Sequence, residues 1–94
     1  MHLQTTRTLQ EVRTTLSPDA ALALAVEFFA TRSGIYAAYP EREGDGYVVL
    51  RGMGGEEIAV AAAPLEDGST RVSGSSFMFD AQVARFLSAL PPAP

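Results

Sequence analysis

Residues 56–90 read EEIAVAAAPLEDGSTRVSGSSFMFDAQVARFLSAL, and this stretch decides the fold. Within it, residues 57–63 form an apolar run of strand length, and residues 70–77 form a second strand-like run. The Asp67-Gly68 dipeptide between the two runs is typical of a tight turn. A helical period follows, and its apolar side consists of Val83, Phe86, Leu87 and Leu90. The stretch therefore predicts a β-hairpin that is closed by an amphipathic helix.

Details of this stretch predict where each element lies and ends. Both faces of residues 57–63 are apolar, which indicates a strand at the centre of a sheet or one covered on both sides. Pro64 ends that strand, because proline has no N–H to donate. Gly74 indicates a bulge or a close approach of another part of the chain. Asp80 is the expected N-cap of the closing helix.

The chain before this stretch begins with a strand and a helix. Residues 4–16 contain five threonines, which favour a strand over the helix that the spacing of the leucines would also allow. Ser17 is suited to cap a helix, and Pro18 is suited to its first position. The helix is expected to run to about Ser33 and to stop at Gly34.

This helix has an apolar stripe and an alanine-rich back. The expected stripe consists of Leu22, Leu24, Val26, Phe28 and Phe29. The back contains Glu27 among alanines and would allow close approach of another layer or subunit. A buried Glu27 would be an acid/base group or a ligand anchor, whereas an exposed or ion-paired one would have neither role. The sequence favours the second interpretation and leaves the role of Glu27 open.

The middle of the chain is expected to add two strands. Residues 35–39 form a short apolar run that ends at Pro40, residues 41–46 form a polar loop, and residues 47–51 form a strand. Residues 52–55 then form a turn. The predicted order is β-α-β-β-β-β-α, an α+β fold with an antiparallel sheet of about five strands packed against two helices. Residues 1–94 are one domain, with fraying expected from about residue 91.

Composition argues against several classes of function and location. The net charge is −4 and the seven basic residues are scattered arginines, so nucleic acid is not an expected partner. The absence of cysteine excludes disulfides, thiolate catalysis and cysteine-based zinc sites. The longest apolar run, residues 20–30, is far shorter than the roughly 20 residues of a membrane span. No signal peptide is visible, and a cytoplasmic location is expected.

Candidate chemical groups are few. His2 is the single histidine, and Glu41, Glu43 and Asp45 alternate in the predicted loop, where a solvated acidic loop is favoured over a cation site. Residues 52–55 are glycine-rich, but no Lys-Ser/Thr pair follows, so a turn is favoured over a phosphate loop. Serines are available, although without a partner for a catalytic triad, at Ser73, Ser75 and Ser76. We therefore expect no enzyme activity, no metal and no cofactor.

Three segments resemble the START/Bet v 1-like superfamily, also known as SRPBCC or polyketide cyclase-like. They are the opening strand and helix start at residues 9–20, the hairpin at residues 58–72, and the closing helix at residues 79–87. The resemblance implies a helix-grip fold, here in a shortened form, since family members usually have six or seven strands. It also implies a cavity between sheet and last helix that holds a lipid-like or aromatic small molecule.

Two functions are consistent with these features. The first is a non-catalytic helix-grip-like module that self-associates, as a homodimer, and binds a hydrophobic small molecule between sheet and helices. The lining residues would be Phe28, Tyr36, Tyr47, Phe77, Phe86 and Leu90. The alternative is a structural or protein-interaction module with a packed interior and no ligand. Three tyrosines are candidates for a pocket mouth or a subunit interface, although ordinary packing on the sheet is favoured: Tyr36, Tyr39 and Tyr47.

Overall fold

A computed structural model describes residues 8–94. Two predictions fall outside this part: the first residues of the predicted strand, 4–7, and His2. The chain folds in the order β-α-β-β-β-β-α, as predicted. The elements are β1 (Thr8–Thr14), α1 (Pro18–Thr31), the 3₁₀ helix η1 (Gly34–Tyr36), β2 (Ala38–Gly44), β3 (Tyr47–Gly52), β4 (Glu57–Pro64), β5 (Thr70–Ser76) and α2 (Asp80–Ala89). Neither helix in this range has both the length and the apolar character needed to cross a bilayer.

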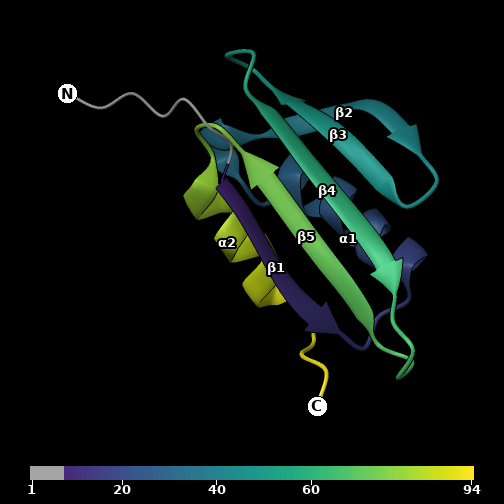
Figure 1. Ribbon diagram of the computed structural model, residues 1–94. Helices are drawn as coiled ribbons and strands as arrows, with labels where there is room; N and C mark the ends of the chain where they lie inside the picture. Colours follow the sequence, from purple (N-terminus) through teal and green to yellow (C-terminus); the bar gives the residue numbers. More distant parts are fainter. Residues whose placement is uncertain (1–7) are drawn as a thin grey trace.

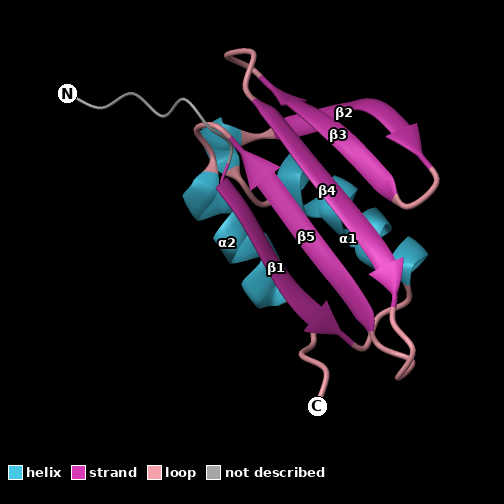
Figure 2. Cartoon of the chain, in the orientation of Figure 1, coloured by secondary structure: helices cyan, strands magenta, loops and turns pink. Residues whose placement is uncertain are grey.

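The five strands form one antiparallel sheet in the order β1-β5-β4-β3-β2 (Figure 1). The apolar strand β4 is the central one, as predicted from its two apolar faces. Both helices lie on the same face of the sheet (Figure 2), α1 against β4 and its neighbours and α2 against β5 and β1. The fold is therefore a two-layer α+β arrangement with one sheet face under helices.

Helix α1 starts where the sequence predicts and turns its predicted apolar stripe toward the core. The Ser17 hydroxyl accepts a hydrogen bond from the Ala20 N–H at 3.1 Å and caps the helix. The buried residues are Ala21, Ala25, Phe28 and Phe29, whereas Leu22, Leu24 and Val26 are only half-buried. All three still pack against the core, as the predicted stripe requires, and the two alanines lie deeper. Small alanine side chains let the helix backbone approach the sheet closely, and the larger side chains pack at its flanks.

Helix α2 turns its predicted apolar side inward: Val83, Phe86, Leu87 and Leu90 are all buried. Its start differs from the prediction, because Asp80 lies inside the helix and Phe79 takes the N-cap position without a side-chain bond. The buried hydroxyl of Ser76 instead accepts hydrogen bonds from the Met78 and Phe79 N–H groups, at 3.3 and 2.8 Å. Ser76 therefore shapes the turn from β5 into α2, which the sequence assigned to Asp80.

Gly74 marks a close approach rather than a bulge. The pairing of β5 with β1 and β4 passes through Gly74 without a shift in register. A Cβ atom at this position would lie 2.7 Å from Cγ1 of Val83, so α2 presses directly on the backbone of β5. Aromatic rings fill the neighbouring space, with centroid separations of 5.4–5.6 Å among Phe28, Phe29 and Phe86.

Strand β2 includes most of the segment that the sequence assigned to a loop. Residues 41–44 belong to β2, residues 42–44 pair with β3, and only residues 45–46 form the turn, where Gly46 has a φ of 82°. The pairing is irregular between Pro40 and Arg42, as expected for a proline at a sheet edge. The charged residues that suggested a loop instead occupy an edge strand, where water solvates them and charges discourage pairing with other chains.

The turn between β4 and β5 couples stability to pH. The pKa of Asp67 lies below its usual range because its carboxylate accepts hydrogen bonds from the hydroxyl and the N–H of Ser69, with Arg13 adding attraction. The unfolded chain therefore binds the proton more readily, so this stabilisation is complete above an ordinary aspartate pKa of about 3.9. It is lost as the pH falls through the lower folded-state value.

We expect Asp67→Asn to flatten the acid side of the stability profile. The substitution removes the titrating group, so the free energy of unfolding should fall less steeply below pH 4 than in the wild-type chain. Urea titrations between pH 2 and pH 7 measure this slope. Asp45→Asn in the exposed β2–β3 turn is the matched control. An equal flattening in both variants would contradict the role given to Ser69.

Candidate functional site

The most distinctive surface of the molecule is a group of exposed apolar side chains at one end of the sheet. The starts of β1, β2 and β4 and the ends of β3 and β5 meet at this end. We name it the apolar end, and it consists of Leu9, Ile35, Tyr36, Tyr39, Met53, Phe77 and Met78. Their exposed fractions run from 38% for Phe77 to 85% for Ile35. Such a concentration is unusual for a surface that faces only water.

Three connections hold five of these side chains, and the other two, Leu9 and Tyr39, lie on β1 and β2. The first is η1, whose Tyr36 ring packs edge-on against the buried Phe79 at 5.6 Å. The second is the β3–β4 turn, closed by the Gly52 N–H donating to the Glu56 carbonyl at 2.7 Å. The third is the β5–α2 turn, built on the buried Ser76. Each connection is hydrogen-bonded or anchored in the core, so the apolar end is a defined surface.

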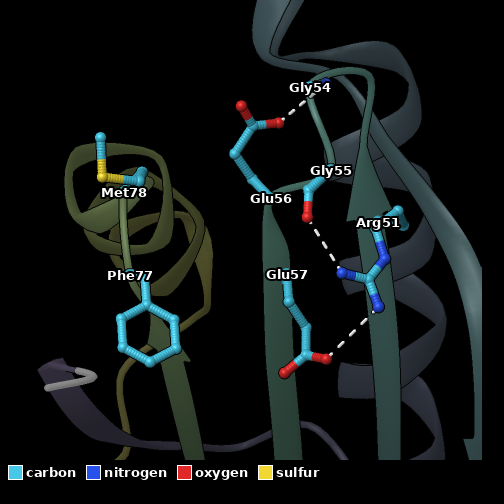
Figure 3. Close-up of a pocket in the computed structure, with 7 residues that line it drawn as sticks. All are labelled: Arg51, Gly54, Gly55, Glu56, Glu57, Phe77 and Met78. Carbon is cyan, nitrogen blue, oxygen red and sulfur yellow. Dashed lines mark hydrogen bonds and ion pairs between the residues drawn. The ribbon is translucent and has the colours of Figure 1, made fainter. Parts of the chain in front are cut away.

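A groove of about 420 Å³ opens within the apolar end, between the β3–β4 turn and the end of β5 (Figure 3). Phe77 and Met78 stand on one side of it, and Glu56 and Glu57 stand on the other (Figure 3). The remaining lining residues are Arg51, Gly54 and Gly55. One side of the groove is therefore apolar, and the other carries carboxylates.

Arg51 organises the charged side of the groove. Its Nη2 lies 2.6 Å from Glu41 Oε2 and 3.5 Å from Glu57 Oε2, and its Nη1 donates to the Gly55 carbonyl at 2.9 Å. The hydrogen bond from Arg51 lowers the pKa of Glu41, and the same bond raises the pKa of Arg51. Arg51 thus joins the middle of β2 and the start of β4 to β3. With its guanidinium engaged on three sides, its role is to shape the groove.

The predicted ligand-binding residues do not come together at one site. Phe28, Phe86 and Leu90 are buried in the core between the helices and the sheet. Tyr36 and Phe77 lie at the apolar end, with exposed fractions of 45% and 38%. The remaining one, Tyr47, lies at the other end of β3, where its ring covers Gly44. Because Tyr47 lies at that far end, the three tyrosines do not form one site, and only Tyr36 and Tyr39 share the apolar end.

The other predicted chemical groups occupy structural positions. Glu41 pairs with Arg51, and Glu27 is exposed and pairs with Arg32 at 3.5 Å, the interpretation that the sequence favoured. Residues 52–55 form the predicted turn. Ser73 and Ser75 are half-buried on the sheet, whereas Ser76 is fully buried. Within residues 8–94, no group of three or more His, Cys, Asp or Glu side chains is placed to hold a metal ion.

Sequence reasoning missed most of the apolar end. The residues that were not singled out as site candidates are Leu9, Ile35, Met53 and Met78. The available signal was the position of these large apolar residues beside strand ends, where turns usually carry polar residues. Their proximity follows only from the strand register, because they come from four separate parts of the chain.

Comparison of the chain with models of protein families, with curated proteins and with solved structures finds no match. The resemblance to the START/Bet v 1-like superfamily therefore stays a prediction. Function has to be argued from the geometry of the chain itself.

Proposed function

We propose that this chain is a non-catalytic interaction module that associates with a second copy of itself through the apolar end. The observation that carries the proposal is the concentration of seven large, exposed apolar side chains at one end of the sheet, five of them on connections. Monomeric proteins rarely leave a contiguous apolar patch of more than a few hundred Å² in water. Association that covers this surface would lower the free energy, because it removes apolar side chains from water.

The size of the apolar end suits a protein partner. Fully exposed side chains of these types present about 150–250 Å² each. Their exposed fractions of 38–85% then correspond to a total on the order of 800 Å². A stable protein–protein interface buries about 800 Å² on each partner. The apolar end is therefore large enough for a dimer interface without contributions from elsewhere on the chain.

The packing of the interior favours a protein partner over a small molecule between sheet and helices. Phe28 and Phe86, two of the predicted lining residues, contact each other at a ring separation of 5.6 Å. Val83 approaches the backbone at Gly74 too closely to admit a Cβ atom. Both contacts support an interior filled by the protein's own side chains. We therefore favour the alternative of a packed interaction module over a lipid-binding one.

The relation to the helix-grip fold remains part of the proposal. The element order β-α-β-β-β-β-α and the position of α2 across β5 and β1 are consistent with a shortened domain of that type. In this proposal the chain keeps the clasp of sheet and terminal helix, and it uses the strand ends for association in place of an internal cavity.

We expect the wild-type chain to have the mass of two chains at micromolar concentration, and Ile35→Glu/Met53→Glu to have the mass of one. The two side chains are 85% and 83% exposed, so the substitutions add charge to the proposed interface without disturbing the core. Burying two unpaired carboxylates should weaken association at least about 100-fold. Light scattering behind size-exclusion chromatography measures the mass across a dilution series.

The matched control for this experiment is Ala23→Glu. Ala23 is exposed on α1, so the variant adds a carboxylate away from the apolar end and should keep the mass of the wild-type chain. A wild-type chain that has the mass of one copy at several hundred micromolar would overturn the proposal. Equal weakening by the control and by the double variant would do the same.

A further inference from the structure

Residues 91–94 lie along the outer edge of β1, although the sequence predicts fraying there. The Thr15 N–H donates to the Pro91 carbonyl at 3.2 Å, and the Ala93 N–H donates to the Arg13 carbonyl at 3.1 Å. Thr14 stands opposite Pro92 as an antiparallel bridge. Side chains add two bonds, from the Thr14 hydroxyl to the Pro91 carbonyl at 2.6 Å and from Arg13 to the Pro94 carbonyl at 2.7 Å. The segment thus extends the sheet by a short stretch beyond β1.

The outward side of this segment has no donor. In an antiparallel pair, alternate residues direct their backbone groups toward the partner and away from it. The residues that direct theirs toward β1 are Pro91 and Ala93, so Pro92 and Pro94 direct theirs outward. Proline has no N–H, and therefore no further strand can receive a backbone hydrogen bond from the segment. Proline at a sheet edge is a known means of preventing association of strands.

The edge beneath the segment is suited to pair with a copy of itself. The same alternation directs the backbone groups of Leu9, Glu11, Arg13 and Thr15 outward, away from β5. An antiparallel pair of two β1 strands with its two-fold axis at Val12 places Glu11 of each copy opposite Arg13 of the other. Two opposite-charge pairs then form in hydrogen-bonded register, and cross-strand pairs of this kind stabilise a sheet.

We propose that the outer edge of β1 is a pairing site for the β1 strand of a second copy, and that residues 91–94 are a removable cap that keeps it closed. Cap and partner strand compete for the same groups, the Arg13 carbonyl and the Thr15 N–H. The partner strand would offer up to about eight backbone hydrogen bonds, and the cap makes two with β1. Three of the four cap residues are exposed, so little apolar burial holds the cap in place.

The cap would set the size of the assembly. A molecule with one two-fold interface forms a closed dimer, whereas a second, separate two-fold interface links dimers into open chains. The apolar end and the β1 edge would be two such interfaces. Keeping the second one covered limits association to the first.

Ala93→Pro tests the cap in the chain of 94 residues. The substitution removes the N–H that bonds to the Arg13 carbonyl, and Ala93→Ser, which keeps that N–H, is the matched control. We expect the weight-average mass of Ala93→Pro to rise to at least about twice that of the wild-type chain at the same concentration. Ala93→Ser should match the wild-type mass. An unchanged mass for Ala93→Pro would overturn the proposal.

Charge exchange tests the register of pairing. In the Ala93→Pro chain, Glu11→Arg places arginines opposite each other and should return the mass to the wild-type value. Adding Arg13→Glu restores opposite charges and should restore the larger mass. A mass that neither substitution changes would overturn the proposed pairing about Val12. The measured quantity is the ratio to the wild-type mass, so this test is valid whether the wild-type chain is a monomer or a dimer. A failure of the apolar-end proposal would instead appear in the mass of the wild-type chain itself.

Discussion

Phe86→Ala is expected to lower the free energy of unfolding by about 3–5 kcal/mol, the usual loss for a buried phenylalanine truncated to alanine. Phe86 has no exposed surface, and its ring contacts Phe28 and Phe29 at centroid separations of 5.6 and 5.5 Å. A domain of this size has a total stability of about 5–15 kcal/mol. The variant should therefore be only marginally folded at 25 °C, as chemical denaturation followed by circular dichroism would measure.

The matched control is Phe77→Ala, which makes the same truncation on the surface. Phe77 is 38% exposed at the apolar end, so its loss should be about 1 kcal/mol. The comparison also separates the two functional hypotheses. A Phe86 ring that lines a ligand cavity would lose fewer packing contacts on truncation, and the losses for the two variants would then be similar. A clear difference supports a filled interior, and similar losses would contradict it.

Two parts of the fold could be predicted from the sequence because local signals and burial agree there. The hairpin and closing helix at residues 57–90 have a turn dipeptide at Asp67-Gly68, two runs of strand length and a single apolar helix face. The start of α1 has a serine cap and a proline at its first position. In each case one arrangement satisfies both the backbone and the hydrophobic pattern, which is the condition for a reliable prediction.

The depth at which each residue of α1 is buried could not be predicted, for the opposite reason. Apolar residues occupy a broad part of this helix, so its periodicity does not say which of them lie deepest. The alanines at 21 and 25 are fully buried because their small side chains allow closer contact between helix and sheet than the leucines at 22 and 24. Strand β2 was predicted too early, at residues 35–39, because the charged residues that follow are typical of a loop. An edge strand needs only one neighbour, so its charged residues remain in water.

The apolar end could be predicted only in part, because it depends on register. Ile35 and Met53 lie in different connections, and each alone reads as an exposed residue that needs no explanation. Only the pairing of β2, β3 and β4 brings their connections to the same end of the sheet. The capping of β1 by residues 91–94 was equally hidden, because its partners are separated by more than 75 residues of sequence.

Gly74→Ala is expected to destabilise the protein by about 1–3 kcal/mol, the usual cost of adding a methyl group to a filled core. In an open strand the same change would stabilise by roughly 0.5–1 kcal/mol, because alanine restricts the unfolded chain more than glycine does. The φ of Gly74 is not positive, so the backbone itself accepts alanine. What opposes the change is Val83, whose Cγ1 would lie 2.7 Å from the added Cβ.

Val83→Ala turns this prediction into a test of how α2 clasps the sheet. Alone, the truncation of a fully buried valine should cost about 1–3 kcal/mol through the space it leaves. In the double variant the methyl group at position 74 occupies part of that space, so the combined loss should be smaller than the sum of the single losses by about 1–2 kcal/mol. Chemical denaturation of the four chains gives this coupling energy. Additive losses would mean that α2 does not rest on the backbone of β5, and the filled interior on which the proposed mode of association depends would lose its support.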